Sequence, residues 1–283
     1  MKYIFFGTPE FAAIILEKLI KAGMPPALVI CNPDRPVGRK KELTPPPTKI
    51  LAQKHGIPVW QPESLDLKPF TLNLGEIRPD FGVVAAYAKI LPKEIIEAFP
   101  KGIIGVHPSL LPKYRGAAPI QSSILAGEEK TGTTLFLLDE KVDHGPILAQ
   151  RELPSPIRQS LIANYQILVR QLAELSGDLL VENLPKFAEG RIKPAEQSHD
   201  EATFTKKFTG EDGFVSDEIL RSAQNDGGGE AVAVDRKIRA LNPEPGVYAI
   251  ENGKRVKLLE AKLENGKLRL KKIQIEGEKP KKT

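Results

Sequence analysis

The sequence contains little cysteine, few aromatic residues and no long apolar run. Its single cysteine, Cys31, excludes an internal disulfide and fits a reducing cytosol. No segment approaches the ~20 consecutive apolar residues that a membrane span requires, and the N-terminus lacks the pattern of a signal peptide. Because apolar residues still make up 41% of the chain, we expect a globular cytoplasmic protein without a membrane association.

The chain also lacks two familiar cofactor signatures. The turn after the first predicted strand reads Gly7-Thr8-Pro9 instead of G-x-G-x-x-G, so the glycines that let a backbone approach a pyrophosphate are missing. No group of cysteine and histidine residues has the spacing of a zinc site. We therefore expect neither a dinucleotide cofactor nor a metal.

Short apolar runs alternate with helical patterns over the first 150 residues. The runs at 3–6, 81–86 and 102–106 are typical of buried parallel strands, and the segments 47–55 and 92–98 are predicted as helices. This alternation predicts an α/β fold, a doubly wound, Rossmann-like parallel sheet with helices on both faces. Ligands of such sheets bind at the carboxyl ends of the strands.

The pattern changes in the last third of the chain. Asn-Gly turns at Asn252 and Asn265 separate strand-like runs, which favours a small antiparallel barrel of the OB-like kind. The glycine-rich segment 221–230 has little to bury and is predicted as a flexible insertion. The length of 283 residues suits two domains. Their predicted bounds are 1–188 and 203–283, with a linker at 189–202.

Basic residues are concentrated in two places. Residues 203–283 hold 17 Lys or Arg against 13 Asp or Glu, and residues 31–49 hold five against two. A basic domain together with a basic loop is typical of proteins that bind a polyanion. Solubility alone would explain the charge equally well, so the charge by itself does not decide between the two.

The segment 102–120, GIIGVHPSLLPKYRGAAPI, concentrates chemically useful residues. His107 ends a predicted strand, and the unperturbed pKa of an imidazole, about 6.5, suits proton transfer near neutrality. Asp143 follows another strand in the sequence VDHGPIL, and a carboxylate next to an imidazole orients it. Each residue alone has a common structural explanation, a histidine bonded to its own loop or an aspartate in a turn.

Together, these motifs resemble one family. The runs FFGTPEFA, PDRPVGRKKELTPPPTK, SLLPKYRGAAPI, DHGPIL and IRALNPEPG are similar to methionyl-tRNA formyltransferase over nearly the whole chain. HPSLLP and D-x-G mark the wider folate-dependent formyltransferase superfamily, whereas RGAAPI, the basic loop and the barrel indicate the tRNA enzyme. The resemblance implies that a formyl group passes from the co-substrate 10-formyltetrahydrofolate to the α-amine of methionyl initiator tRNA, in translation initiation and without a metal.

The resemblance also assigns roles to site residues. His107 would stabilise the oxyanion, and Asp143 would orient His107 and help to move the proton to the leaving nitrogen. The family pattern Asn-Val-His reads Gly105-Val106-His107 here, so a water or another side chain has to replace the asparagine as oxyanion donor. His144 is predicted to face solvent. The folate pocket is predicted to involve Ser109, Leu110, Leu111, Pro112, Ala86, Tyr87, Leu91, Asp139 and Val142.

By the same resemblance, initiator tRNA is the macromolecular partner. The basic loop would enter the acceptor stem, with Arg39 as the family's key arginine, and such loops often order on binding RNA. Glu244 stands where the family usually has tryptophan, which predicts different barrel packing or tRNA contacts. The predicted tRNA-binding residues are Arg35, Arg39, Lys40, Lys41, Lys206 and Lys207.

Three functions remain in competition. The tRNA-directed formyltransferase accounts for all the motifs. A catalytically impaired homologue that binds tRNA or folate is supported only by Gly105. A formyltransferase acting on a free metabolite would share HPSLLP and D-x-G but would need neither the basic loop nor the barrel. No heptad pattern or long apolar stripe indicates an oligomer, so a monomer is expected.

Overall fold

The protein is described by a computed structural model that covers residues 1–38, 41–65, 75–154 and 164–283. Contacts within the chain group it into two units, each built from several segments. The first unit comprises Met1–Arg115, Gly132–Leu153 and Val169–Thr203, and the second comprises Gly116–Thr131, Pro154–Leu168 and Phe204–Thr283. The domain bounds 1–188 and 203–283 stay a prediction. In the described ranges, no helix has the length and apolar character needed to cross a membrane.

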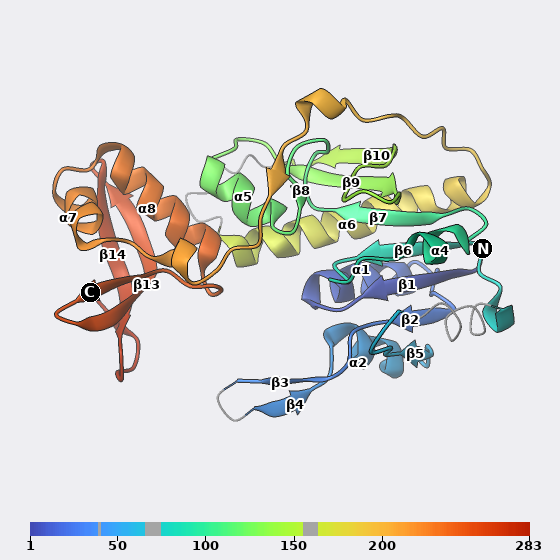
Figure 1. Ribbon diagram of the computed structural model, residues 1–283, viewed down its shortest axis with the longest axis horizontal. Helices are drawn as coiled ribbons and strands as arrows, with labels where there is room; N and C mark the ends of the chain where they lie inside the picture. The colour runs from blue at the N-terminus through green and yellow to red at the C-terminus, as the bar shows by residue number, and fades with distance from the viewer. Residues whose placement is uncertain (39–40, 66–74, 155–163) are drawn as a thin grey trace. The chain divides into compact units, whose positions relative to one another are not determined.

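A seven-stranded sheet forms the centre of the first unit (Figure 1). Its strands are, in spatial order, β10 (Ile147–Glu152), β9 (Gly132–Leu137), β7 (Ile103–His107), β6 (Phe81–Ala85), β1 (Tyr3–Gly7), β2 (Leu28–Ile30) and β5 (Val59–Trp60). The strands from β7 to β5 are parallel, whereas β9 and β10 are antiparallel to their neighbours. The α/β class is therefore confirmed, but the sheet is mixed. Residues 108–131, between β7 and β9, contain one helix, α5 (Pro119–Ala126), and this helix belongs to the second unit. The first unit therefore has no helix that could cross over from β7 to a parallel β9.

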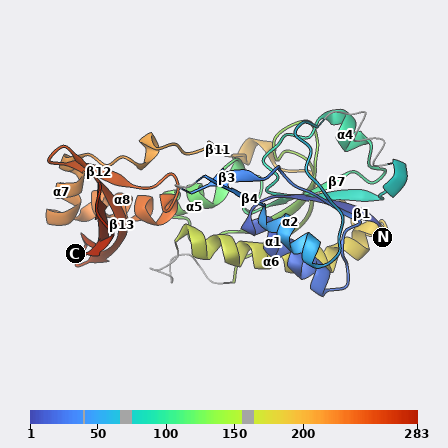
Figure 2. The same ribbon diagram turned by 90° about the horizontal axis from the view of Figure 1, so that it is seen from below.

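Helices cover both faces of this sheet (Figure 2). The helices are α1 (Glu10–Lys21), α2 (Pro47–Lys54), α4 (Lys93–Glu97) and α6 (Tyr165–Ala188). On the face of α1 and α6, Tyr3 stacks on Phe81, which meets Phe187 of α6 edge to face. On the face of α4, Phe6 packs edge to face against Phe99 in the main hydrophobic cluster. Alternate residues of β1 thus bury opposite faces of the sheet, as a strand covered on both sides requires.

The second unit combines an antiparallel sheet with helices. Its elements are α5 (Pro119–Ala126), α7 (Asp217–Asn225), α8 (Gly228–Leu241), β12 (Tyr248–Glu251), β13 (Lys254–Glu264), β14 (Lys267–Ile275) and β15 (Lys281–Lys282). The strands follow one another in chain order. Asn252 and Asn265 occupy the predicted hairpin turns with φ of 49° and 52°, the left-handed conformation that such turns need. The predicted barrel-like antiparallel unit is confirmed. Four other short elements lie outside the two main sheets, namely β8 (Arg115–Gly116), η1 (His199–Glu201), β11 (Phe204–Thr205) and η2 (Glu211–Gly213). Of these, η1 and the first residue of β8 lie in the first unit.

The prediction of a flexible insertion at residues 221–230 is wrong. This segment forms the end of α7 and the start of α8, with Gly227 between the two helices. A Cβ atom on Gly227 would overlap the carbonyl oxygen of Gly266, so glycine allows a close approach of backbones here. Ala223 is completely buried. Small residues therefore mark close packing in this segment, which composition alone does not distinguish from disorder.

We expect Ala223→Asp to lower the free energy of unfolding by about 3 kcal/mol or more, because the substitution buries an unpaired carboxylate. Arg221→Ala is the matched control, since the Arg221 side chain is 73% exposed and pairs with Asp217 at the surface. Its expected effect is within about 0.5 kcal/mol. Chemical denaturation measures both variants, and two equally small losses would support the flexible insertion instead.

Candidate active site

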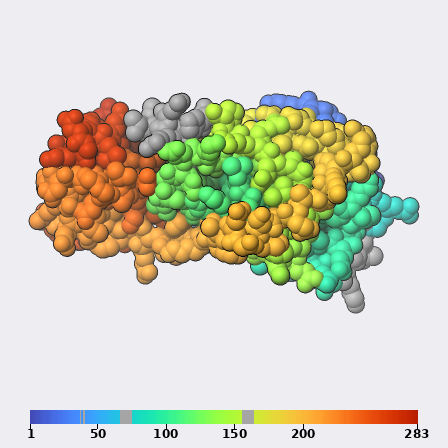
Figure 3. All heavy atoms as spheres, turned by 90° about the horizontal axis from the view of Figure 1, so that it is seen from above, coloured from blue at the N-terminus to red at the C-terminus, as the bar shows by residue number. Residues whose placement is uncertain are grey.

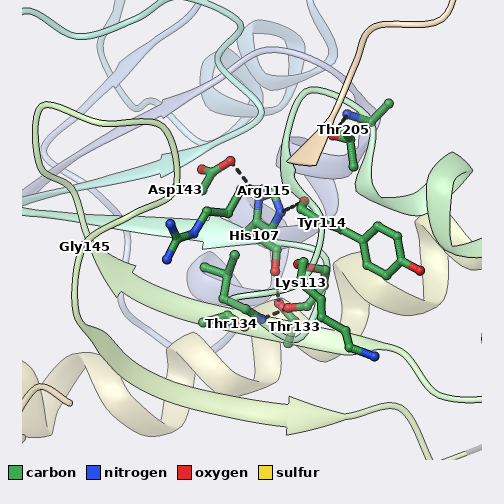
Figure 4. A network of polar contacts seen from close by, with 12 residues as sticks. His107, Lys113, Tyr114, Arg115, Thr133, Thr134, Asp143, Gly145 and Thr205 are labelled. Atoms are coloured by element: carbon green, nitrogen blue, oxygen red, sulfur yellow. Dashed lines mark hydrogen bonds and ion pairs between the residues drawn. The ribbon is translucent and has the colours of Figure 1, made fainter. Parts of the chain in front are cut away.

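His107 lies at the carboxyl end of β7, and both of its ring nitrogens contact protein atoms (Figure 4). Nε2 is 2.8 Å from the carbonyl oxygen of Tyr114, and Nδ1 is 3.5 Å from Oδ2 of Asp143. A carbonyl only accepts hydrogen bonds, so this partner assigns a proton to Nε2. At Nδ1, a proton on either the ring or the carboxyl group makes the contact favourable, whereas two facing lone pairs would repel. The two predicted residues therefore meet in one site, with Nδ1 of His107 facing the Asp143 carboxyl group.

The two members of this pair differ in exposure. The side chain of Asp143 is 20% exposed and that of His107 is 6% exposed. A molecule that enters the site meets the carboxylate more readily than the imidazole. The imidazole lies behind the carboxylate and is almost completely covered by protein.

Hydrogen bonds from β9 and β10 hold the loop that follows His107. Thr134, the cross-strand neighbour of His107, accepts from the Leu111 N–H at 3.1 Å and donates to the Ser109 carbonyl at 2.7 Å. Gln150 donates to the Leu111 carbonyl at 2.7 Å. Neither Thr134 nor Gln150 was predicted from the sequence. The strand register brings them to the site, and no local motif signals that register.

Asp143 lies in a tight loop between β9 and β10. The Leu137 N–H donates to the Pro146 carbonyl at 2.9 Å and closes the loop. A Cβ atom on Gly145 would overlap the carbonyl oxygen of Leu137, which explains the glycine of the D-x-G motif. Asp143 itself has a φ of 49°, a conformation that residues other than glycine rarely adopt. Such strain persists only where surrounding contacts enforce it, and it is frequent at active sites.

The space next to Gly105 is filled by apolar side chains. A Cβ atom on Gly105 would lie 2.5 Å from Cζ of Phe136 and 2.7 Å from Cδ1 of Leu138. Phe136 is the cross-strand neighbour of Gly105 and is buried. No room remains for the asparagine that the resemblance leads one to expect at this position. An oxyanion formed in the site has to be stabilised by a group other than a side chain at position 105.

The residues of the predicted folate pocket differ widely in exposure. Ser109, Leu111, Tyr87 and Leu91 are buried, whereas Leu110, Pro112 and Asp139 are half-buried and Ala86 and Val142 are exposed. The Tyr87 ring packs edge to face on Phe6, and burial raises its pKa to about 12, so this ring belongs to the core. Contact of these residues with folate stays a prediction.

Two buried polar atoms near the carboxyl ends of the strands have no hydrogen-bond partner within the described part of the chain. They are the hydroxyl of Tyr87, which follows β6, and Oδ1 of Asn32, which follows β2. Buried polar atoms are usually satisfied by protein, water or ligand. The two atoms lie at the edge of the sheet where ligands of such folds bind.

His144, which was predicted to face solvent, is 26% exposed and has two side-chain partners. Its Nδ1 lies 2.6 Å from Oδ2 of Asp139, and its ring stacks on that of His199 with centroids 4.1 Å apart and planes at 2°. His199 lies in the segment that was predicted as a linker. A contact between residues this far apart in sequence has no local signal, which is why the sequence analysis missed it.

The predicted basic loop begins with a two-stranded hairpin, β3 (Arg35–Val37) paired with β4 (Glu42–Thr44). Asp34 anchors its base, because it accepts from Gln61 at 2.8 Å and pairs with Lys49 at 2.9 Å. The hydrogen bond from Gln61 and the nearby Lys49 ammonium lower the pKa of Asp34. The hairpin is thus fixed at its base.

The predicted tRNA contacts within the described ranges are exposed, namely Arg35, Lys41, Lys206 and Lys207. Arg39 and Lys40 lie outside the described residues. The Lys206 ammonium lies 2.5 Å from Asp212, and this hydrogen bond lowers the pKa of the Asp212 carboxyl group. A polyanion at Lys206 would have to compete with this carboxylate.

Neither a metal site nor a reactive thiol is found in the part of the chain that the structure describes. Among the residues that the structure describes, no group of three or more His, Cys, Asp or Glu side chains is placed to hold a metal ion. Cys31 is buried, and this burial raises the pKa of its thiol to about 11. The thiol is therefore not a ready nucleophile at neutral pH.

Known proteins match the chain over both units. Residues 1–174 match the formyl transferase family, and residues 229–278 match the family described as formyl transferase, C-terminal domain. The methionyl-tRNA formyltransferase of Chloroflexus aurantiacus is 41% identical over 263 residues, which cover 92% of this chain and 80% of that protein.

Solved structures share the fold at low sequence identity. The methionyl-tRNA formyltransferase of Clostridium thermocellum has a TM-score of 0.58 at 19% identity, covering 97% of this chain and 98% of that one. An N-formyltransferase of Helicobacter canadensis, solved with folinic acid and dTDP-3-aminofucose, has a TM-score of 0.67 at 18% identity, covering 97% and 95%.

We expect Gly105→Asn to lower the free energy of unfolding by about 1–3 kcal/mol, because the new side chain overlaps Phe136. Adding Phe136→Ala to this variant removes the overlap with Phe136 and leaves that with Leu138, so the double variant should lose less stability than the sum of the two single variants. Gly210→Asn is the control, since nothing lies within 4 Å of a Cβ atom at that position. Urea unfolding of the four variants tests this account. A Gly105→Asn protein as stable as the unaltered chain would contradict it.

Proposed function

The chain belongs to the methionyl-tRNA formyltransferase family, and we propose that it transfers the formyl group of 10-formyltetrahydrofolate to the α-amine of methionyl initiator tRNA. The observation that carries this proposal is the contact of His107 with Asp143 at 3.5 Å. It occurs in a chain that is 41% identical to a methionyl-tRNA formyltransferase over 92% of its length. We further propose that the protein acts in the cytoplasm as a monomer.

Asp143 is the group best placed to move the proton of the reaction. When the amine nitrogen bonds to the formyl carbon, it has to lose a proton, and the leaving nitrogen has to gain one as its bond to that carbon breaks. A carboxylate at 20% exposure that is backed by an imidazole can accept the first proton and deliver it to the second nitrogen. His107 keeps the carboxylate oriented through Nδ1, while the Tyr114 carbonyl fixes the ring through Nε2.

The co-substrate is proposed to bind at the carboxyl edge of the sheet. The Tyr87 hydroxyl and Asn32 Oδ1, which have no hydrogen-bond partner among the described residues, lie at this edge, and Val142, at 55% exposure, provides apolar surface next to Asp143. A pterin ring needs this combination of polar edge contacts and apolar covering.

Initiator tRNA is the proposed acceptor because basic residues occur where the family places its RNA contacts. Arg35 and Lys41 are exposed on the anchored hairpin, and residues 203–283 hold 17 Lys or Arg against 13 Asp or Glu. Phosphate contacts of this kind give binding that weakens as the salt concentration rises.

One observation favours a second candidate function. The filled space next to Gly105 removes a side-chain oxyanion donor, and losing one such donor typically costs on the order of a hundredfold in rate. A protein that binds tRNA and folate with little or no turnover is therefore the alternative to an active enzyme.

We expect the chain to formylate methionyl initiator tRNA and to discriminate against the elongator form. Asp143→Asn should lower kcat by about 10²–10⁴-fold, because an amide cannot accept the proton. Glu140→Gln is the matched control, since Glu140 is an exposed acid of the same loop that pairs with Lys93, and its kcat should stay within twofold. Formyl transfer followed over time measures each rate. Salt-sensitive tRNA binding without transfer would favour the binding protein, and full activity of Asp143→Asn would contradict the assigned role.

A further inference from the structure

Residues 195–199, which we call the strap, lie against the loop that carries Asp143. Ala195 and Ile147 exchange two backbone hydrogen bonds, at 2.7 and 2.9 Å. Figure 1 shows this segment passing along the β10 edge of the sheet, and Figure 3 shows it at the surface next to the residues of the β9–β10 region. Although the sequence predicts a linker here, the strap forms part of the first unit.

Gln197 of the strap is 5% exposed and uses both ends of its amide group. Its Nε2 donates to the carbonyls of Asp143 at 3.1 Å and Gly145 at 2.7 Å. Its Oε1 accepts from Nη2 of Arg115 at 2.6 Å and from Nε of Arg115 at 3.2 Å. Both N–H groups of Nε2 and both lone pairs of Oε1 therefore have partners. Because carbonyls only accept and a guanidinium only donates, the amide nitrogen must face the two carbonyls and the amide oxygen must face Arg115.

Arg115 connects this arrangement to the loop that follows His107. It is 3% exposed, and Figure 4 shows it extended toward the loop of Asp143 and Gly145. A buried guanidinium without hydrogen-bond partners is costly in free energy. Breaking the hydrogen bonds between Arg115 and Gln197 would therefore be unfavourable, which keeps the two side chains together. Its Nη2 also donates to Nδ1 of His199, which fixes a second strap residue. Through the strap, the loop that carries Asp143 and the loop after His107 support each other.

We propose that Gln197 is a positioning residue for the reaction, which holds the backbone of Asp143 and Gly145 so that the Asp143 carboxylate stays opposite His107. Asp143 needs such support because its φ of 49° is unfavourable. Its contact with His107 is already 3.5 Å, so a small shift of the loop would break it. Displacements of about 1 Å can cost on the order of a hundredfold in rate. The kinetic part of this inference rests on the proposed function.

Gln197→Glu isolates the contact to the loop. Glutamate keeps the shape of the side chain and still accepts from Arg115, but it replaces the donor that faces the two carbonyls by an acceptor. We expect kcat to fall about 10- to 100-fold, with KM for both substrates within threefold. Gln197→Met, which removes the amide without adding charge, should lower kcat similarly.

The control is Thr48→Val. It breaks a buried hydrogen bond from the Thr48 hydroxyl to the Gly7 carbonyl, at 2.8 Å, in the same unit. We expect kcat of this variant to stay within twofold. An equal loss of kcat in this control and in the Gln197 variants would assign the effect to general destabilisation.

A double-variant cycle separates positioning from a structural role. If Gln197 acts through the Asp143 carboxylate, then Gln197→Glu should lower the single-turnover rate by less than about threefold when Asp143→Asn is already present. The same 10- to 100-fold loss in both backgrounds would overturn the proposal. A rise in KM with unchanged kcat in the single variant would also overturn it.

Amide hydrogen exchange of the peptide that covers residues 139–146 tests the proposal without the reaction. We expect exchange at least tenfold faster in Gln197→Glu than in the unaltered chain, at temperatures well below unfolding of either protein. Unchanged exchange would overturn the proposal. If the unaltered chain transfers no formyl group, the proposed function fails, while the exchange measurement still decides whether Gln197 holds the loop.

Discussion

His107 ends β7 and Asp143 lies in the loop after β9, so their contact at 3.5 Å depends on how β7 and β9 lie beside each other. Because β9 is antiparallel to β7, Thr134 lies opposite His107 and reaches the loop that follows it. The strand pairing therefore brings together His107, Asp143 and the groups that support them.

The strained backbone of Asp143 is held by several independent contacts. Gly145 lets the loop close against Leu137, Gln197 donates to two of its carbonyls, and Asp139 binds the neighbouring His144. Each hydrogen bond contributes on the order of 1 kcal/mol, which together is enough to offset a single residue in an unfavourable conformation. The site thus combines rigid support with one accessible carboxylate.

The features of the fold and the site that depend on short stretches of sequence could be predicted. His107 and Asp143 were identified because each follows a strand-like run, and the Asn-Gly turns identified the hairpins of the second unit. Gly105 was recognised as a departure from the family, but its physical meaning required the register that places Phe136 opposite it. Arg115 and Gln197 meet across a long stretch of chain, so no spacing could reveal them. Ala223 was missed because a segment rich in glycine and polar residues has the composition of a flexible sequence even where it packs closely.

His107 carries a proton on Nε2 and faces Asp143 through Nδ1. Nitrogen NMR of ¹⁵N-labelled histidine in the intact chain reports this arrangement most directly, with Asp143→Asn used to assign the signal of Nδ1. We expect Nε2 of His107 to remain protonated in the folded protein and only the Nδ1 signal to respond strongly to the substitution. A neutral ring with its proton on Nδ1 and a bare Nε2 would contradict this arrangement.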